Sequence, residues 1–245
     1  MLTVSNLNKH FGDLSIFENF NLHLAPNGFT ALVGPSGCGK STLFNVLAGV
    51  VAKDGGSVTL QGRDVSHLGT ASAYMHQKDL LLPWFTLLDN ALLPSRIAGE
   101  NPDKSTTKAR ALFERLGLKG FESYRPGEIS GGMRQRCALV RTLMFERELV
   151  LLDEPLSALD AITRRSLQSL LLLLQVEFKR TILMITHDIE EALMLADEIL
   201  VLSGRPMRVL DQIYPGGTKL RRLDDPRLIE IKLYVLNLLQ GELNK

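Results

Sequence analysis

The sequence predicts an α/β fold, in which buried parallel strands alternate with helices. Short apolar runs indicate the strands. Phe29 to Val33, Leu149 to Leu152 and Ile182 to Ile185 are apolar almost throughout, as expected for strands covered on both faces of a parallel sheet. Helical segments lie between these runs, and this alternation is characteristic of α/β proteins. A glycine-rich segment follows the first run directly and opens a helix, as a phosphate-binding loop does.

Further segments complete the alternation along the chain. Strands are also expected at Leu2 to Leu7, Ala73 to Met75 and Ile199 to Leu202. Helices are expected at Lys40 to Ala48, Ser105 to Leu116, Gly132 to Phe145 and Ala158 to Phe178. We expect all of these elements to form one domain over residues 1–245.

The C-terminal tail carries start and stop signals for one more helix, over residues 226–240. Asp225 and Pro226 fit the N-cap and the first helical position, and Gly241 fits the end of the helix. We interpret this segment as a packing helix, with a regulatory element as the alternative. Its apolar face consists of Leu228, Ile229, Leu233, Leu236 and Leu239.

Composition bounds the possible functions. The chain has 245 residues, of which 45% are hydrophobic, so it can bury a substantial core. Its 28 basic and 27 acidic residues leave a net charge of +1, which predicts no nucleic-acid partner because such proteins need a basic patch or stripe. The strongest basic cluster is Lys219, Arg221 and Arg222, which we interpret as a solvated turn.

Cysteine usage and hydropathy place the expected protein in the cytosol. Cys38 and Cys137 have no metal-ligand spacing and form no disulfide framework, so both are expected as reduced thiols. The N-terminus lacks the apolar region of a signal peptide. The richest apolar stretch, Leu170 to Leu174, is far shorter than the ~20 residues of a spanning helix, so we expect no membrane crossing.

Residues 34–41 read Gly-Pro-Ser-Gly-Cys-Gly-Lys-Ser, which fits the phosphate-binding motif G-x-x-x-x-G-K-[ST] between a strand and a helix. Glycines let the backbone wrap the phosphates with N–H groups inward, and the helix N-terminus adds a positive dipole end. Lys40 then neutralises phosphate charge and the Ser41 hydroxyl ligates Mg²⁺. The expected ATP contacts are Gly34, Pro35, Ser36, Gly37, Cys38 (backbone only), Gly39, Lys40, Ser41 and Thr42.

Two carboxylates end the apolar strand Leu149 to Leu152. Asp153 is expected to hold Mg²⁺ directly or through water. Glu154 would then face the γ-phosphate and polarise the attacking water as a general base. The alternative is a pair of ordinary surface acids, and the nearby phosphate loop makes the catalytic interpretation the better one.

A second anion site is predicted at Ser130, Gly131 and Gly132, which stand just before a helix. One domain does not need two phosphate sites, far apart in sequence, for a single nucleotide. We therefore expect this turn to complete the pocket of another copy, which predicts that ATP is hydrolysed in a dimer.

With these motifs the chain resembles the nucleotide-binding subunits of ABC transporters over essentially its whole length. Residues 129–135 are similar to the LSGGQ signature, with Ile129 in place of leucine and Met133 in place of the usual glutamine. Both changes keep the serine and glycines that touch phosphate, so activity is expected. The resemblance implies a P-loop NTPase with a RecA-like core, an antiparallel β subdomain and a helical signature subdomain over residues 80–144.

The resemblance also implies roles for four more residues. Phe11 lies where an upstream aromatic stacks on adenine, with a core aromatic as the alternative. Gln77 resembles the Q-loop glutamine that senses Mg²⁺ and the γ-phosphate. Asp160 resembles the D-loop aspartate at the dimer seam. His187 resembles the switch histidine that contacts the γ-phosphate, so Glu154, His187 and Gln77 are the expected catalytic set.

The segment from Gln77 to Asn90 resembles importers of nitrate, sulfonates, taurine and thiamine pyrimidine precursors. The resemblance implies a homodimer, or a pair with a paralogous ATPase subunit, on the cytoplasmic face of the membrane. Integral permease subunits would bind it directly, and an extracytoplasmic solute-binding protein would act indirectly. The alternatives are an exporter subunit and a soluble ABC ATPase.

The same segment contains an apolar run from Leu80 to Phe85 in an expected loop, with the single tryptophan, Trp84, and a helix-breaking Pro83. Loops lie on the surface, where a contiguous apolar patch marks an interaction site. We expect this run to line a groove that receives the membrane subunit. The alternative is that it closes the core between the two lobes.

Overall fold

The computed structural model describes residues 1–157 and 161–243 and has a six-stranded sheet at its centre. The strand order β10-β9-β3-β8-β7-β6 is parallel except for β10, which pairs antiparallel with β9. The predicted α/β class is therefore confirmed. The strands are β3 (Phe29–Val33), β6 (Ser72–Met75), β7 (Leu149–Asp153), β8 (Thr181–Ile185), β9 (Glu198–Leu202) and β10 (Val209–Ile213).

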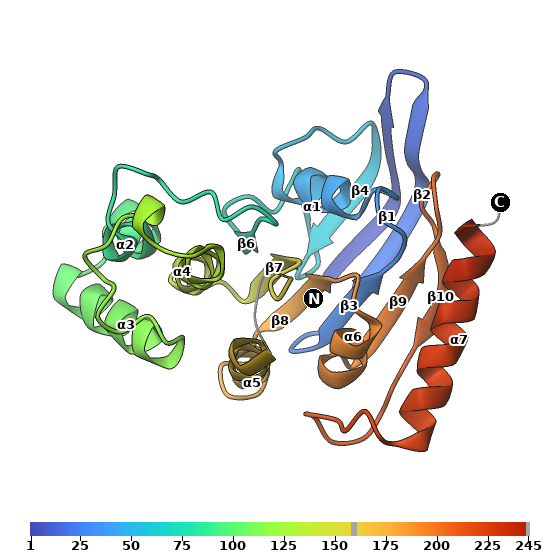
Figure 1. Ribbon diagram of the computed structural model, residues 1–245. Helices are drawn as coiled ribbons and strands as arrows, with labels where there is room; N and C mark the ends of the chain where they lie inside the picture. The colour runs from blue at the N-terminus through green and yellow to red at the C-terminus, as the bar shows by residue number, and fades with distance from the viewer. Residues whose placement is uncertain (158–160, 244–245) are drawn as a thin grey trace.

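A second, antiparallel sheet has the order β2-β1-β4-β5. It consists of β1 (Leu2–Phe11), β2 (Leu14–Leu24), β4 (Gly55–Leu60) and β5 (Arg63–Val65). The first strand runs further than predicted, to Phe11, because the alternation of buried and exposed side chains continues past Leu7 into the turn with β2. Figure 1 shows this sheet projecting beside α1, with the β1–β2 turn at its tip.

Helices cover both faces of the central sheet. α1 (Lys40–Ala48) lies between the two sheets, and α5 (Ala161–Val176) and α6 (Ile189–Leu195) pack on the opposite face (Figure 1). The core therefore has two layers, and β3 contributes to both. Phe29, Ala31 and Val33 pack in the layer with α5 and α6, whereas Leu32 packs with α1.

A helical part stands apart from the sheets on the left of Figure 1. It contains α2 (Leu87–Ile97), α3 (Pro102–Arg115), the short 3-10 helix η1 (Pro126–Glu128) and α4 (Gly131–Leu143). The side chains of Thr86, Asn101 and Ser130 cap the three long helices by accepting backbone N–H groups. Its exact limits as a subdomain, 80–144, stay a prediction.

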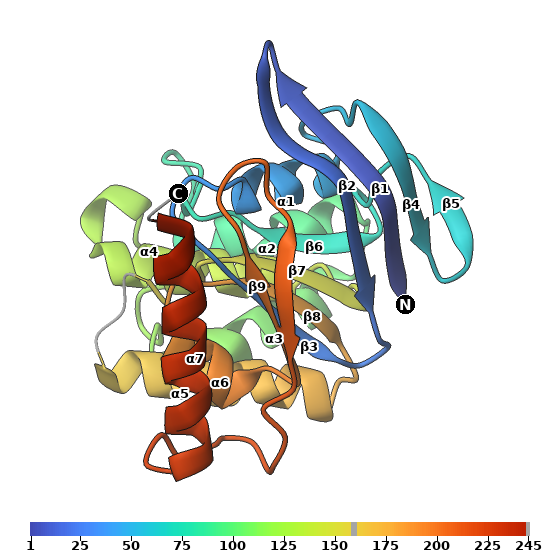
Figure 2. The same cartoon turned by 90° about the vertical axis from the view of Figure 1, so that its right-hand side faces the viewer.

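The tail helix α7 (Pro226–Leu243) runs along the outer side of β10 and α6 (Figure 2). Asp225 caps it as predicted, accepting the N–H of Arg227 at 3.0 Å. The predicted end at Gly241 is wrong, because the helix continues through this glycine to Leu243. A glycine weakens a helix interior without breaking it when the backbone remains helical.

The interpretation of the basic cluster as a solvated turn is also wrong. Arg221 is buried and donates to the carbonyls of Leu193 and Ala196 at 2.8 and 2.9 Å. Lys219 lies 2.7 Å from Asp197, so only Arg222 of the three is largely solvated. The cluster therefore fastens the segment before α7 to the core. In the part of the chain that the structure describes, no helix is long and apolar enough to cross a membrane.

Candidate functional site

Four neighbouring parallel strands bring the predicted catalytic and metal-binding residues to one edge of the central sheet. Strand β3 leads into the phosphate loop, β7 ends at Asp153, and His187 and Gln77 lie just beyond the ends of β8 and β6. These strands are adjacent in the order β3-β8-β7-β6, and Asp153 is in register with Ile185. The carboxyl ends of parallel strands are where α/β sheets bind ligands.

The phosphate loop is held in shape by its own lysine. Lys40 is buried at 7% exposure, and its ammonium donates to the carbonyls of Gly34 and Pro35 at 2.8 and 2.7 Å. Gly39 caps α1 with φ 122°, and a Cβ there would lie 2.6 Å from Ile16 Cγ2, so only glycine fits. The loop thus places a cation and a helix N-terminus at the same point.

Asp153 is a buried carboxylate without its full set of partners. It is 2% exposed, and Oδ1 has no hydrogen-bond partner among the described residues. Burial, with a smaller contribution from the charge of Glu154, raises the pKa of Asp153 to about 6, although the Ser41 hydroxyl and Lys40 act in the opposite direction. An orphaned oxygen beside the Ser41 hydroxyl fits a hard cation such as Mg²⁺.

Other ligands would have to come from the nucleotide and water. The described residues contain no group of three or more His, Cys, Asp or Glu side chains able to hold a metal by themselves. Mg²⁺ in nucleotide sites characteristically uses one or two protein oxygens together with substrate phosphates and waters. Asp153 and Ser41 therefore meet the requirement without a dedicated protein cage.

Glu154 links the ends of β6 and β8. Its Oε2 accepts from the Gln77 amide at 3.0 Å, and its Oε1 lies 3.4 Å from His187 Nδ1. Glu154 has φ 50°, in the left-handed region that is uncommon for residues other than glycine, and its N–H donates to Ile185. Such backbone strain clusters at functional sites, and here it turns the carboxylate toward both polar side chains.

Ser130 lies in a different part of the molecule from the phosphate loop. It caps α4, accepting the N–H of Met133 at 3.3 Å, and both Ser130 and Gly131 are exposed. Figure 1 places α4 away from α1, toward the helical part. Within the described residues no hydrogen bond joins Ser130 to the phosphate loop, so one copy does not bring the two predicted anion sites together.

The sequence model of the family described as ABC transporter matches residues 17–157. The chain belongs to the ABC transporter family. The taurine import ATP-binding protein TauB of Burkholderia thailandensis is 39% identical over 239 residues, 94% of this chain and 92% of that protein. TauB of Escherichia coli (strain K12) is 38% identical over 245 residues, 97% of this chain and 96% of that protein.

Solved structures support the same assignment. The ATP-binding cassette MJ0796, in a dimeric post-hydrolysis state bound to ADP and Pi, superposes with a TM-score of 0.82 at 26% identity. The match covers 89% of this chain and 100% of that chain. The chain is thus an ABC ATPase, and the predicted P-loop NTPase fold with RecA-like and antiparallel parts is confirmed.

Within this ABC cassette, Phe11 is half exposed, at 50%, at the end of β1. The alternative of a core aromatic is therefore wrong. The Lys9 ammonium lies 5.0 Å from the centre of its ring, which shows that a cation already uses this face. Adenine stacking by Phe11 stays a prediction. Asp160 lies outside the described residues, so its D-loop role also stays a prediction.

Gln135 is a functional contact that the sequence did not single out. It is 5% exposed in α4, and its amide donates to the Glu154 carbonyl at 3.0 Å. The helix that Ser130 opens is thereby tied to the backbone of the expected general base. The sequence did contain a signal for this contact. Gln135 lies on the same helix face as the apolar residues Ala138 and Leu139, three and four positions later, and both of these are buried.

The loop from β6 to α2 carries the exposed tryptophan. Trp84 is 64% exposed and Leu80 52%, so the alternative that these two side chains close the core is wrong, although Leu81 is buried. Asn90 is fully buried and binds both the N–H and the carbonyl of Leu82.

The start of this loop is fastened to α4. Arg141 donates to the carbonyls of Asp79 and Leu80 at 2.7 and 2.8 Å. Arg134 pairs with the Asp79 carboxylate at 3.1 Å. The exposed apolar side chains therefore sit on a backbone that is held from both α2 and α4.

Proposed function

We propose that this chain is the ATPase subunit of an importer for taurine or a related sulfonate, working with separate membrane subunits. The observation that carries the ATPase role is that Gln77 and His187 both contact the Glu154 carboxylate beside the phosphate loop. The importer role rests on near full-length similarity to two proteins named taurine import ATP-binding proteins. The other solutes of this subgroup, nitrate and thiamine precursors, are alternatives within the same proposal.

The residues at the sheet edge divide the chemistry among them. The phosphate loop, from Gly34 to Thr42, binds the phosphates of ATP, with Lys40 leaving its loop carbonyls to meet them. Asp153, Ser41 and Gln77 would hold Mg²⁺, which screens the phosphate charge. Glu154 accepts the proton of the water that attacks the γ-phosphorus, and the bond to the bridging oxygen of ADP breaks.

His187 and Gln77 prepare Glu154 for this step. Both contact its carboxylate, so a γ-phosphate and its water would replace these contacts. His187 is 59% exposed at its side chain and is free to turn toward the phosphate. A change in the bound nucleotide would therefore alter the contacts at the ends of β6 and β8 together.

Hydrolysis requires two copies. Ser130, Gly131 and Gly132 are solvent-accessible and distant from their own phosphate loop, so a second subunit arranged head-to-tail would place them over the γ-phosphate. The similar cassette MJ0796 is described as dimeric when bound to ADP and Pi, which supports a dimer. We propose a homodimer, or a pair with a paralogous subunit, that closes on ATP and opens after hydrolysis.

The membrane subunits would dock beside Trp84. Its loop presents apolar side chains to solvent on a rigid backbone, as an interaction site requires. Arg141 and Gln135 lie on the same helix, so the loop and Glu154 are both anchored on α4. Docking would hold the ATPase at the cytoplasmic face of the membrane, with a solute-binding protein acting from the other side.

Affinity purification from detergent-solubilised membranes tests this proposal. The tagged chain should recover a polytopic permease and, after crosslinking, a solute-binding protein. The recovered binding protein should take up taurine in a titration with the pure compound. Recovery of a polytopic partner without any binding protein would favour an exporter, and recovery of no membrane protein would favour a soluble ABC ATPase.

A further inference from the structure

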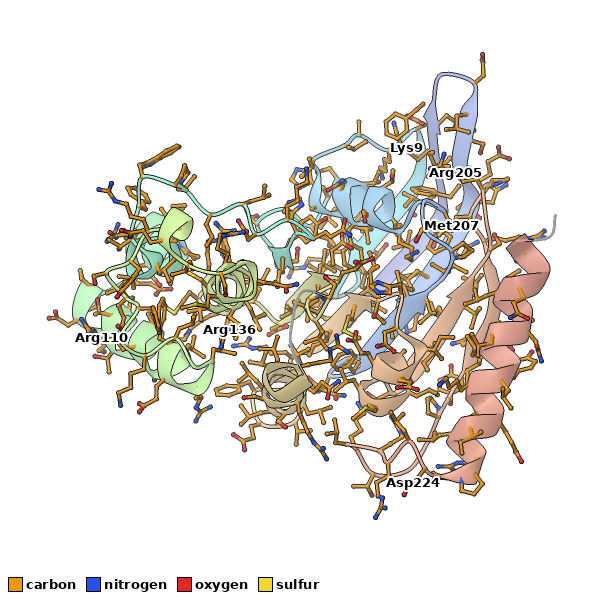
Figure 3. The ribbon with its side chains drawn as sticks, in the orientation of Figure 1. Lys9, Arg110, Arg136, Arg205, Met207 and Asp224 are labelled. Atoms are coloured by element: carbon orange, nitrogen blue, oxygen red, sulfur yellow. The ribbon has the colours of Figure 1, made fainter. Side chains whose placement is uncertain are left out.

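The turn between β9 and β10, residues 203–208, lies against the phosphate loop although the two are far apart in sequence. Arg205 Nε donates to the Gly37 carbonyl at 2.6 Å. Met207 Sδ lies 3.9 Å from Cys38 Sγ, and its N–H donates to the carbonyl of Ile16 in β2 at 2.7 Å. Figure 3 labels both side chains, and Met207 lies against β2 there.

Hydrogen bonds hold the turn at residues 203–208 in place. Ser203 is 2% exposed, and its hydroxyl donates to the carbonyl of Gly204 and accepts the N–H of Arg208 at 3.0 Å. The N–H of Gly204 also reaches the Glu242 carboxylate of α7 at 3.3 Å. Arg205 is therefore held at its base from two sides, and its contact with Gly37 does not depend on a mobile loop.

The contact decides how one peptide of the phosphate loop is turned. In a planar trans peptide the carbonyl of Gly37 and the N–H of Cys38 point in opposite directions. Arg205 holds this carbonyl outside the loop, so the Cys38 N–H points inward, where it donates to Pro35 at 3.4 Å. The Lys40 ammonium donates to the same Pro35 carbonyl. Both donors are thus directed to the place where a phosphate oxygen would accept them.

The backbone at Gly37 is flexible, so a contact that fixes the orientation of its peptide affects the shape of the phosphate loop. This glycine has φ 76° and is exposed, so its backbone has little to restrain it apart from Arg205. The positive charge of the Arg205 guanidinium is not neutralised locally, because no carboxylate pairs with Arg205 among the described residues. By contrast, the Lys9 ammonium on β1 is paired with Asp54 at 2.9 Å.

We propose that Arg205 is a positioning residue of the nucleotide site, which holds the Gly37–Cys38 peptide in its phosphate-accepting orientation and adds a positive charge beside the bound phosphates. The inference deepens the proposed phosphate site and requires only that the purified chain binds ATP and ADP. It does not depend on the membrane partner or on the solute, so failure of the importer proposal would leave it standing.

Nucleotide titration of purified variants provides the test. Arg205→Ala should weaken ATP and ADP binding about fivefold, the scale of one exposed charge-assisted hydrogen bond. Arg208→Ala is the matched control, because it removes the same charge from the same turn and its side chain has no hydrogen bond to the phosphate loop within the described residues. It should leave both affinities within about twofold, the range of a neutral surface substitution.

Steady-state kinetics separate positioning from a merely structural role. Arg205→Ala should raise KM for ATP in step with the loss of affinity and leave kcat unchanged, because Arg205 does not touch the attacking water. Its ATP affinity should also depend less on salt concentration than that of the native chain. Arg205→Lys, which keeps the charge and loses the planar fork, should fall between the two and serves as the test if the alanine variant does not fold.

The proposal is overturned by native ATP and ADP affinity in Arg205→Ala, or by equal losses in the Arg205 and Arg208 variants. A fall in kcat at unchanged KM would also overturn it, because that result would place the effect on catalysis or on the folded fraction. For Arg205→Lys alone, the overturning result is affinity and KM indistinguishable from those of the native protein.

Discussion

Neutralising Asp153 should stabilise the protein in the absence of nucleotide while abolishing its ATPase activity. The carboxyl group is 2% exposed, its Oδ1 has no partner among the described residues, and its pKa is about 6 against an ordinary 3.8. A folded-state pKa above the unfolded value means that the native protein binds more protons between these two pH values. The folded state therefore loses stability as pH rises through this window.

The size of the effect follows from the shift. Ionisation of a carboxyl group whose pKa is raised from 3.8 to about 6 costs about 3 kcal/mol of folding free energy at pH 8 and about half as much at pH 5. Asp153→Asn keeps the shape and removes the charge. Its free energy of unfolding should exceed that of the native chain by about 2 to 3 kcal/mol at pH 8, with about half of this gain at pH 5.

Urea unfolding in EDTA, without nucleotide, measures the free energy of unfolding of the variant and of the native chain at pH 8 and at pH 5. Glu154→Gln is the matched control, because its carboxylate already accepts a hydrogen bond from Gln77 and should yield a smaller gain. Addition of ATP and Mg²⁺ should stabilise the native chain and should stabilise the Asp153→Asn variant much less. The reasoning is refuted if Asp153→Asn is no more stable than the native chain at pH 8, or if its gain is the same at pH 5.

Three other substitutions test the remaining parts of the site. Glu154→Gln should bind ATP but slow hydrolysis by about 100-fold or more and trap a dimer in size-exclusion chromatography; a monomer with normal turnover contradicts the general-base role. Ser130→Arg should abolish hydrolysis and leave the ATP affinity of the dilute monomer intact; a large loss of affinity there would place Ser130 in its own pocket. Trp84→Ala should release the membrane partner while changing stability by no more than about 0.5 kcal/mol, since the side chain is 64% exposed; circular dichroism, thermal unfolding and copurification decide between docking and packing.

The helices and strands nearest the chemistry were the most predictable. The phosphate loop, the strand before Asp153 and the strand before His187 are continuous segments whose residues are neighbours in sequence, so pattern and spacing suffice to locate them. The antiparallel strands β2, β4, β5 and β10 were not located. The pairings of β2 and β4 with β1, and of β10 with β9, contain register shifts that disturb the alternation of polar and apolar residues. Strand β5 has only 3 residues, too few for a pattern.

The tail and its basic cluster show the limit of local signals. Arg221 looks like a solvated residue in sequence, yet it satisfies two carbonyls at the end of α6. A buried guanidinium is stable only when such partners surround it, and these partners come from another segment of the chain. Gly241 likewise continues a helix because the rest of α7 is held against the core.

The sequence by itself was enough to identify an ATPase. The signals were a strand followed by a glycine loop with Lys40, and a second strand that ends in Asp153 and Glu154. Each of these is a local arrangement that depends on residues adjacent in sequence. Only the tertiary structure decided which distant groups restrain them. Gln135 reaches the Glu154 carbonyl from α4, and Arg205 reaches Gly37 from the β9–β10 turn. These contacts join different segments that only the folded structure brings together, and a hydrogen bond between side chain and backbone leaves no periodic trace in either segment.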